Sequence, residues 1–227
     1  MPLLEVIAST VEDAVEAEAG GAGRIELVRD LARGGLTPPL ALVQSVLAAV
    51  SIPVRVMLRA GENHQIDHEN EIARLLEDAA ALASLPIDGL VLGFRRGAVP
   101  ELSLTARVLA AAPNHPATFH HAFEEMSDPI EAIAQLKRLP QIDRILTHAG
   151  PGLWTSKAAT LQAYIAAAAP EIRILAGGGI DESAIRFLRR ETNVEEFHAG
   201  RAARLPATSD APVTRTRVRQ LVGALRR

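Results

Sequence analysis

The residues best suited to chemistry in this sequence are two glutamates, an arginine and a histidine: Glu5, Glu26, Arg59 and His120. His120 lies in the run TFHHAF at 118–123, which closes a short β-type segment just before a helical one. Chains of alternating strands and helices usually place their chemistry at strand ends. A glutamate carboxylate and the imidazole of His120 would transfer protons, and the guanidinium of Arg59 would anchor an anion. The alternative is that His120 makes only a structural hydrogen bond.

The same residue types could instead bind a metal ion. Imidazole and carboxylate groups suit Zn²⁺, Cu²⁺ and Mn²⁺. The candidate metal ligands are His120, His198 and Glu26. These three residues are far apart in the sequence, so no short ligand spacing supports the site.

Two glycine-containing turns, at 177–179 and 199–201, follow β-type segments. Many barrels bind phosphate at such positions, with the first turn leading into a helix N-terminus. The candidates for binding phosphate, a phosphorylated cofactor or another anion are Gly178, Gly179 and Gly200. The alternative is that these are only tight turns and a helix cap, because Asp181 and Glu182 at the helix start would repel an anion.

Eight short β-type segments alternate with helical segments along the whole chain. The β-type segments are 3–8, 24–28, 53–58, 88–93, 116–120, 143–147, 171–176 and 194–198. This alternation favours a parallel sheet, and eight units in one domain most often close as a TIM-type (β/α)8 barrel. An open doubly wound sheet is the alternative, but Gly-x-Gly-x-x-Gly is missing after the first strand. The sequence therefore predicts one α/β barrel domain over 1–227, in which 205–212 links to a closing helix at 213–225.

Two further predictions concern helix capping and the barrel interior. Ser9 and Glu12 have the spacing of a capping box at the start of the first helix. Because the strand face toward the helices must be apolar, the other face points inward, and the predicted interior contains Glu5, Arg24, Glu26, Arg55, Arg59, His120, Glu196 and His198. Buried charges must pair, bind water or meet a ligand. Bracing ion pairs are favoured for Arg55 and Glu196, and a functional role for the residues nearer the C-terminal strand ends.

The composition narrows the functional classes. The 227 residues are 48% hydrophobic, which suffices for one buried domain, and the net charge of -3 gives no sign of a nucleic acid or anionic membrane partner. The sequence has no cysteine, so disulfides and thiolate chemistry are excluded. Neither Lys137 nor Lys157, the only lysines, lies at a strand end, which disfavours Schiff-base chemistry. No apolar run approaches 18 residues, and the start lacks a signal-like segment, so a cytoplasmic protein is expected.

Nine collinear segments share one further pattern. They are 4–6, 20–27, 34–38, 56–59, 88–93, 118–123, 144–147, 176–179 and 196–198. Together they resemble the CutC family, which is named for copper homeostasis. The resemblance covers nearly the whole chain and implies a compact TIM-type barrel, a cytoplasmic location and a homo-oligomer. Copper as a ligand is implied by this resemblance alone.

The chain departs from the family pattern at several places, which marks a divergent member. Val28 stands where the family typically has a cysteine, and the copper proposal for the family depends on cysteine thiolates. Residues 59–64 read RAGENH where an Arg-Pro-Arg motif is usual, while His121 replaces an arginine and His148 a serine. Because Cu(I) prefers thiolate and thioether ligands, we do not expect this cysteine-free chain to bind Cu(I) directly.

Three functional classes remain open at this stage. The first is the copper homeostasis role that the resemblance implies. The second is an acid/base enzyme of the isomerase or lyase type, acting on a small phosphorylated or carboxylated metabolite. The third is a non-catalytic binding or scaffold protein. The expected partners are a small anionic molecule or a metal ion, and further copies of the same chain.

Overall fold

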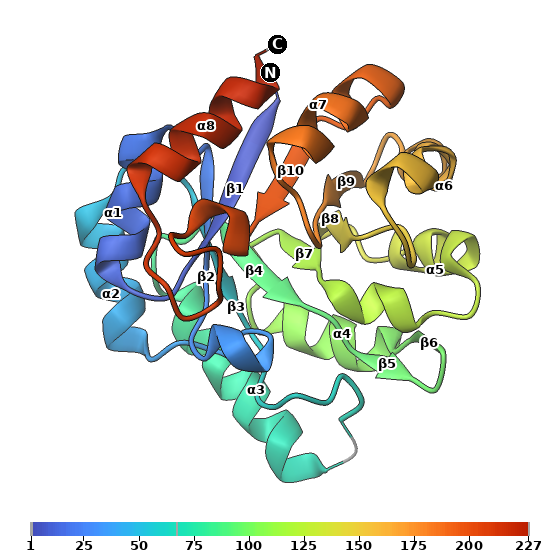
Figure 1. Ribbon diagram of the computed structural model, residues 1–227. Coiled ribbons are helices and arrows are strands. Elements are labelled where there is room, and N and C mark those ends of the chain that lie inside the picture. The colour runs from blue at the N-terminus through green and yellow to red at the C-terminus, as the bar shows by residue number, and fades with distance from the viewer. Residues whose placement is uncertain (1, 67, 227) are drawn as a thin grey trace.

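The computed structural model describes residues 2–66 and 68–226, and its centre is a closed barrel of parallel strands (Figure 1). Around the barrel, hydrogen-bonded strands follow one another in the order β1-β10-β9-β8-β7-β4-β3-β2, and β2 pairs with β1 to close it. The strands are β1 (Leu3–Ala8), β2 (Arg24–Leu27), β3 (Val54–Met57), β4 (Gly89–Leu92), β7 (Ala117–Phe119), β8 (Ile142–Thr147), β9 (Arg173–Ala176) and β10 (Glu196–Ala199). The predicted TIM-type barrel is therefore confirmed.

Helices surround the barrel and cover its apolar outer face (Figure 1). They are α1 (Val11–Gly20), α2 (Leu40–Ala49), α3 (Glu69–Ala83), α4 (Leu102–Ala110), α5 (Pro129–Leu136), α6 (Trp154–Ala168), α7 (Glu182–Glu191) and α8 (Arg215–Leu225). The short 3-10 helices are η1 (Leu31–Arg33), η2 (His121–Glu125) and η3 (Arg201–Ala203). None of the helices in the described part of the chain is long and apolar enough to cross a membrane.

The strand pattern places apolar and polar side chains on opposite sides of the barrel wall. Ile25, Leu27, Val54 and Val56 are buried in the large core between the strands and the helices. The alternate positions of these strands therefore face inward. One feature that the sequence pattern did not predict is a two-stranded hairpin of β5 (Arg95–Arg96) and β6 (Val99–Pro100), which follows β4.

A layer of ion pairs crosses the barrel interior; we call it the polar layer. Arg55 binds Asp143 through two hydrogen bonds of 2.7 Å and Asp88 through one of 2.9 Å. Glu196 accepts hydrogen bonds from three arginines. The polar layer consists of Arg24, Arg55, Arg144, Arg173, Glu5, Asp88, Asp143 and Glu196. These contacts agree with the predicted bracing role of Arg55 and Glu196.

The start of α1 differs from the predicted capping box by one residue. The N-cap is Thr10, whose hydroxyl accepts the backbone N–H of Asp13 at 3.0 Å. The Asp13 carboxylate in turn accepts the backbone N–H of Ser9 at 3.0 Å. The predicted pair of Ser9 and Glu12 was therefore wrong, because a second hydroxyl residue follows Ser9 and a second acidic residue follows Glu12.

We expect Thr10→Ala to lower the free energy of unfolding by about 1 kcal/mol, because it removes an N-cap acceptor. Ser9→Ala is the matched control and should have little effect, since the Ser9 hydroxyl has no hydrogen-bond partner in the described chain. Urea unfolding of both variants measures the difference. A larger loss in Ser9→Ala than in Thr10→Ala would contradict this capping assignment.

Candidate functional site

A cavity of about 680 Å³ opens among the loops that follow the barrel strands. Most of the residues that the sequence predicted as functional line it: Glu26, Arg59, His120, Gly178, Gly179, His198 and Gly200. Glu5 is fully buried and is in contact with His198. The cavity thus lies at the end of the barrel where enzymes of this architecture keep their sites.

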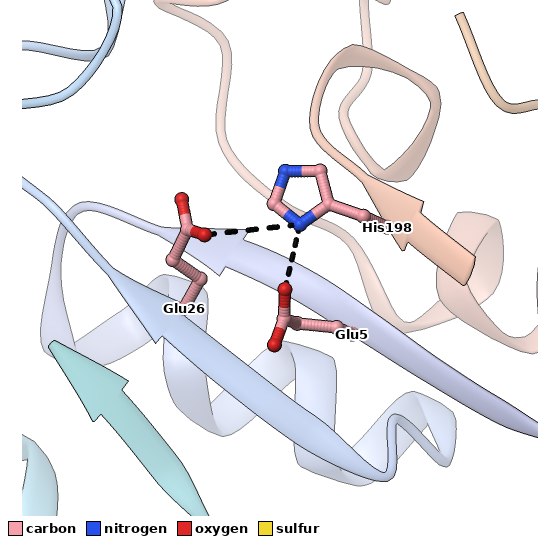
Figure 2. A group of neighbouring side chains, drawn as sticks. All are labelled: Glu5, Glu26 and His198. Atoms are coloured by element: carbon pink, nitrogen blue, oxygen red, sulfur yellow. Dashed lines mark hydrogen bonds and ion pairs between the residues drawn. The ribbon is translucent and has the colours of Figure 1, made fainter. Parts of the chain in front are cut away.

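Glu5, Glu26 and His198 point toward one another from three neighbouring strands (Figure 2). Strand pairing explains this arrangement, because Glu5 of β1 lies beside His198 of β10, and Glu26 of β2 lies beside Ile7 of β1. The Nδ1 atom of His198 is 2.7 Å from a Glu5 oxygen and 3.9 Å from a Glu26 oxygen. We call these three residues the carboxylate–histidine cluster.

Glu5 is held as a carboxylate by its neighbours. One of its oxygens accepts a hydrogen bond from Arg24 and the other is bound to His198. Burial raises the pKa of Glu5, but the charges and hydrogen bonds of Arg24 and His198 outweigh burial and hold the pKa below its ordinary value. Glu5 therefore orients the ring of His198 and does not itself exchange protons near neutral pH.

Glu26 has the opposite environment. Its Oε2 atom is buried and has no hydrogen-bond partner among the described residues. Burial raises the pKa of Glu26 from an ordinary value of 4.5 to about 7, and the charge of Glu5 adds to the rise while His198 and Arg24 oppose it. A carboxyl group that titrates near neutral pH at a cavity wall is suited to general acid or base chemistry.

Burial is the main reason that Glu26 retains a proton, and the polar layer gives it no guanidinium partner to offset that burial. The four guanidinium groups of this layer face its four carboxylates, so Glu26 is an additional acid with no guanidinium partner among the described residues. Burial lowers the pKa of His198, but Glu26 and Glu5 outweigh burial and leave that pKa raised. Glu26 and His198 together therefore form a site that holds a proton beside the cavity.

The carboxylate–histidine cluster also has the spacing of metal ligands, with its ligand atoms within 4.8 Å of one another. Two carboxylates and one imidazole are hard or borderline ligands, whereas Cu(I) prefers sulfur, so this donor set does not fit Cu(I). Both Glu5 oxygens are already bound, one of them by the guanidinium of Arg24, which would repel a cation. A proton fits this cluster better than a metal ion does.

The structure separates His120 from the carboxylate–histidine cluster. His120 follows β7, which lies across the barrel from β1. The predicted metal ligands Glu26 and His198 do come together, but Glu5 takes the third place, and metal binding stays a prediction. The ring of His120 contacts that of His64 instead, with centroids 4.9 Å apart.

Arg59 was predicted to point into the barrel interior, but β3 ends at Met57 and the side chain of Arg59 lines the rim of the cavity instead. Its guanidinium donates to the carbonyl oxygens of Gly34 and Gly35 at 3.1 and 3.3 Å, and to that of Glu62 at 2.6 Å. These partners are uncharged carbonyl groups, so the positive charge of Arg59 remains available to a ligand.

The glycine turns lie at the cavity, but the adjacent helix end is already capped. Gly178 and Gly179 have φ of 79° and 77°, which favours glycine, and a Cβ at Gly178 would lie 2.8 Å from the His148 side chain. The carboxylate of Asp181 accepts the Ala184 N–H at 2.8 Å at the start of α7. The predicted anion site at these glycines stays a prediction, and the acidic cap of α7 weighs against it.

Two histidines that line the cavity, His64 and His121, were not among the predicted site residues. His121 has ring contacts with His148 and His198, with centroids 5.9 and 6.5 Å apart. Burial, followed by the charges of His198 and His148, lowers the pKa of His121 to about 3, so its ring is neutral. The signal that could have found these residues is their position in segments that depart from the family pattern.

Comparisons with known proteins match the chain to one family over most of its length. A family model described as the CutC family covers residues 2–203. A CutC family protein of Mesorhizobium japonicum is 32% identical over 210 residues, which span 92% of this chain and 81% of that protein. The copper homeostasis protein cutC homolog of Homo sapiens is 32% identical over 197 residues, which span 86% of this chain and 72% of that protein.

Solved structures share the fold. A CutC protein of Streptococcus agalactiae matches with a TM-score of 0.80 and 28% identity, over 87% of this chain and 98% of that one. A thiamine phosphate pyrophosphorylase of Pyrococcus furiosus matches with a TM-score of 0.62 and 16% identity, over 99% and 95% of the two chains. The second likeness supports the fold alone, because one fold carries many functions.

Proposed function

The chain belongs to the CutC family, and from that premise we propose that it serves copper homeostasis by binding a small anionic metabolite in its cavity and exchanging a proton with it. In this proposal the chain does not hold Cu(I) itself. The observation that carries the proposal is Glu26, a buried carboxyl group without a guanidinium partner at the cavity wall, beside His198. The reaction class is that of an isomerase or a lyase.

Three features of the described residues support a proton-exchanging site. The pKa of Glu26 is raised by burial to about 7, so the carboxyl group can take or release a proton near neutral pH. His198 is oriented by a hydrogen bond of 2.7 Å to Glu5, which fixes the ring beside Glu26. Arg59 supplies a positive charge at the rim of the same cavity, where an anionic group would be attracted.

The family is named for copper homeostasis, but the residues of this chain do not provide the ligands that Cu(I) prefers. The sequence has no cysteine, and Met57 is the one methionine among the described residues that line the cavity. A single thioether beside imidazoles and carboxylates is a poor donor set for Cu(I). A role in copper homeostasis would therefore be indirect, through the metabolite. A cytoplasmic location and a homo-oligomeric state are part of the proposal, supported by the family resemblance.

We expect purified, tag-free protein to show no Cu(I) binding above that of a competing chelator in isothermal titration. Zn(II) serves as the control ion, because carboxylate and imidazole ligands suit it. Wild type is compared with Glu26→Gln and His120→Ala. Tight Cu(I) binding that either substitution abolishes would contradict the proposal and establish a cysteine-free copper site.

A further inference from the structure

The hydrogen bonds of His120 define which of its nitrogens carries the proton. The backbone N–H of Ala122 donates to His120 Nδ1 at 3.1 Å, so Nδ1 must present a lone pair. The neutral ring therefore carries its proton on Nε2. Burial holds the pKa of His120 well below its ordinary value, and the nearby charges of His64 and Arg59 lower it further. His120 is thus a neutral hydrogen-bond donor.

The Nε2–H group of His120 has no acceptor. His120 is 3% exposed, and its Nε2 atom has no hydrogen-bond partner in the described chain. Leaving a buried donor unpaired costs about 1–3 kcal/mol, so such a group calls for an explanation. The ring is also fixed in place, because it packs so closely on Gly93 that a Cβ there would lie 2.6 Å from His120 Nδ1. A rigid, unpaired donor that lines a cavity is suited to a ligand oxygen.

Arg59 provides a second unpaired donor at the same cavity. Its Nε atom is buried without a hydrogen-bond partner among the described residues, although the two terminal nitrogens bind carbonyl groups. No carboxylate in the described chain lies within salt-bridge distance of Arg59, unlike the arginines of the polar layer. Its charge is also close enough to His120 to act on that ring. Two unpaired donors therefore line the same cavity. The positive charge of Arg59 is felt by Glu62 and Glu125, but neither carboxylate forms an ion pair with it among the described residues.

We propose that His120 and Arg59 form a subsite for a carboxylate group of the small metabolite that the cavity binds. This inference rests on the proposed function and names the chemistry of its ligand. A carboxylate oxygen would accept the Nε2–H of His120, while the guanidinium of Arg59 would balance the negative charge. The ring of His64 packs beside His120 and is held by Glu125. We expect this contact to yield when a ligand arrives, because Glu125 is exposed.

A carboxylate fits this subsite better than a phosphate does. The subsite offers two N–H donors, which match the two oxygens of a planar carboxylate. The phosphate position that glycine turns provide in other barrels lies beside Asp181 and Glu182 here, and Asp181 already occupies the N-terminus of α7. Negative charge on that side of the cavity would repel a phosphate group. We therefore expect the subsite to take a carboxylate, while the acidic start of α7 leaves a phosphate group without its usual second position at the glycine turns.

The test uses malonate and inorganic phosphate as probes for protein labelled with ¹⁵N at histidine. We expect long-range ¹⁵N–¹H spectra to show the His120 proton on Nε2, and malonate to shift that signal in a saturable way. Phosphate should bind at least tenfold more weakly. Arg59→Gln and His120→Leu should each weaken malonate binding roughly tenfold or more, the effect of losing a charged hydrogen bond. His120→Gln, which keeps an N–H donor at a similar reach, should retain part of the affinity.

Arg201→Gln is the matched control, because Arg201 also lines the cavity but is exposed. Four results would each overturn the subsite. Two concern binding, namely the absence of malonate binding and phosphate binding as tight as that of malonate. The others are a proton on Nδ1 of His120 in the wild type and a loss of affinity in Arg201→Gln equal to that in Arg59→Gln. The wild-type spectrum and Arg59→Gln keep the test decisive even if His120→Leu does not fold. Tight Cu(I) binding by protein that also binds malonate through Arg59 would instead overturn the proposed function and leave the subsite standing.

Discussion

Glu26→Gln is expected to raise the free energy of unfolding by about 3 kcal/mol at pH 8, but by only about 1 kcal/mol at pH 5. The pKa of Glu26 is raised by burial to about 7, from an ordinary value of 4.5. That difference corresponds to about 3 kcal/mol of unfavourable free energy when the carboxylate is ionised in the folded state. Glutamine has nearly the same shape and no charge, so the variant avoids this cost.

The direction of the pH dependence follows from where the proton is bound. In the unfolded chain Glu26 loses its proton near pH 4.5, whereas the folded protein keeps it until about pH 7. Between these values the folded state binds more protons than the unfolded state, so the stability of the wild type falls as the pH rises. His198 acts in the same direction, because its raised pKa gives stability that is present below pH 6.5 and is lost as the pH rises through the folded value. Glu26→Gln should reduce the pH dependence that comes from Glu26 itself. It should also reduce the part that comes from His198, because the charge of Glu26 helps to raise the pKa of His198.

Urea unfolding of wild type and Glu26→Gln at pH 5 and pH 8 measures the effect. Glu195→Gln is the matched control, because Glu195 is an exposed neighbour of β10 outside the cavity. It should follow the wild-type stability at both pH values. Equal pH dependence in wild type and Glu26→Gln would show that Glu26 is ionised throughout, and the proton-exchanging role of the site would fall with it.

The sequence predicted the barrel and the inward-facing residues because both depend on local patterns. Alternation within β1, β2 and β10 was enough to place Glu5, Glu26 and His198 on the inner face. Their mutual contact could also follow from topology, because closing a barrel makes the first and last strands neighbours. The predicted metal site combined Glu26 and His198 with His120 rather than with Glu5, and the order of strands places β7, which precedes His120, across the barrel from β1.

The surroundings of Arg59 and His120 depend on tertiary contacts, which local sequence patterns do not predict. Arg59 follows the alternation of β3, but the strand ends at Met57 and the side chain turns to carbonyl groups of the loop after β2. The unpaired state of His120 Nε2 depends on a backbone N–H that occupies the other ring nitrogen. The shift of the α1 cap from Ser9 to Thr10 is smaller, since both residues can cap a helix and only the backbone selects one.

Glu196→Ala is expected to lower the free energy of unfolding by about 3–5 kcal/mol, because Glu196 belongs to the polar layer. Removing one partner of a buried ion pair leaves the opposite charges uncompensated, and losses of this size follow. Glu196 accepts hydrogen bonds from Arg24 at 2.8 Å and from Arg144 at 2.7 and 3.0 Å, and Arg173 lies 3.3 Å away. Arg24 is 2% exposed, so water cannot replace the lost carboxylate there.

The pH dependence of Glu196→Ala should separate this charge effect from a loss of packing. Burial raises the pKa of Glu196, but Arg144 and Arg24 outweigh burial and hold the pKa at about 2. The stabilisation by Glu196 is therefore present above pH 4.5 and is lost as the pH falls toward 2. Urea unfolding should show the variant furthest below the wild type at neutral pH, with the gap narrowing in acid. Glu195→Ala, an exposed neighbour, should change little. A difference in the free energy of unfolding that stays constant down to acid pH would mean that Glu196 fills space rather than balances three guanidinium groups. The charges of the polar layer would then not balance, and Glu26 could no longer be called an acid in addition to a balanced layer.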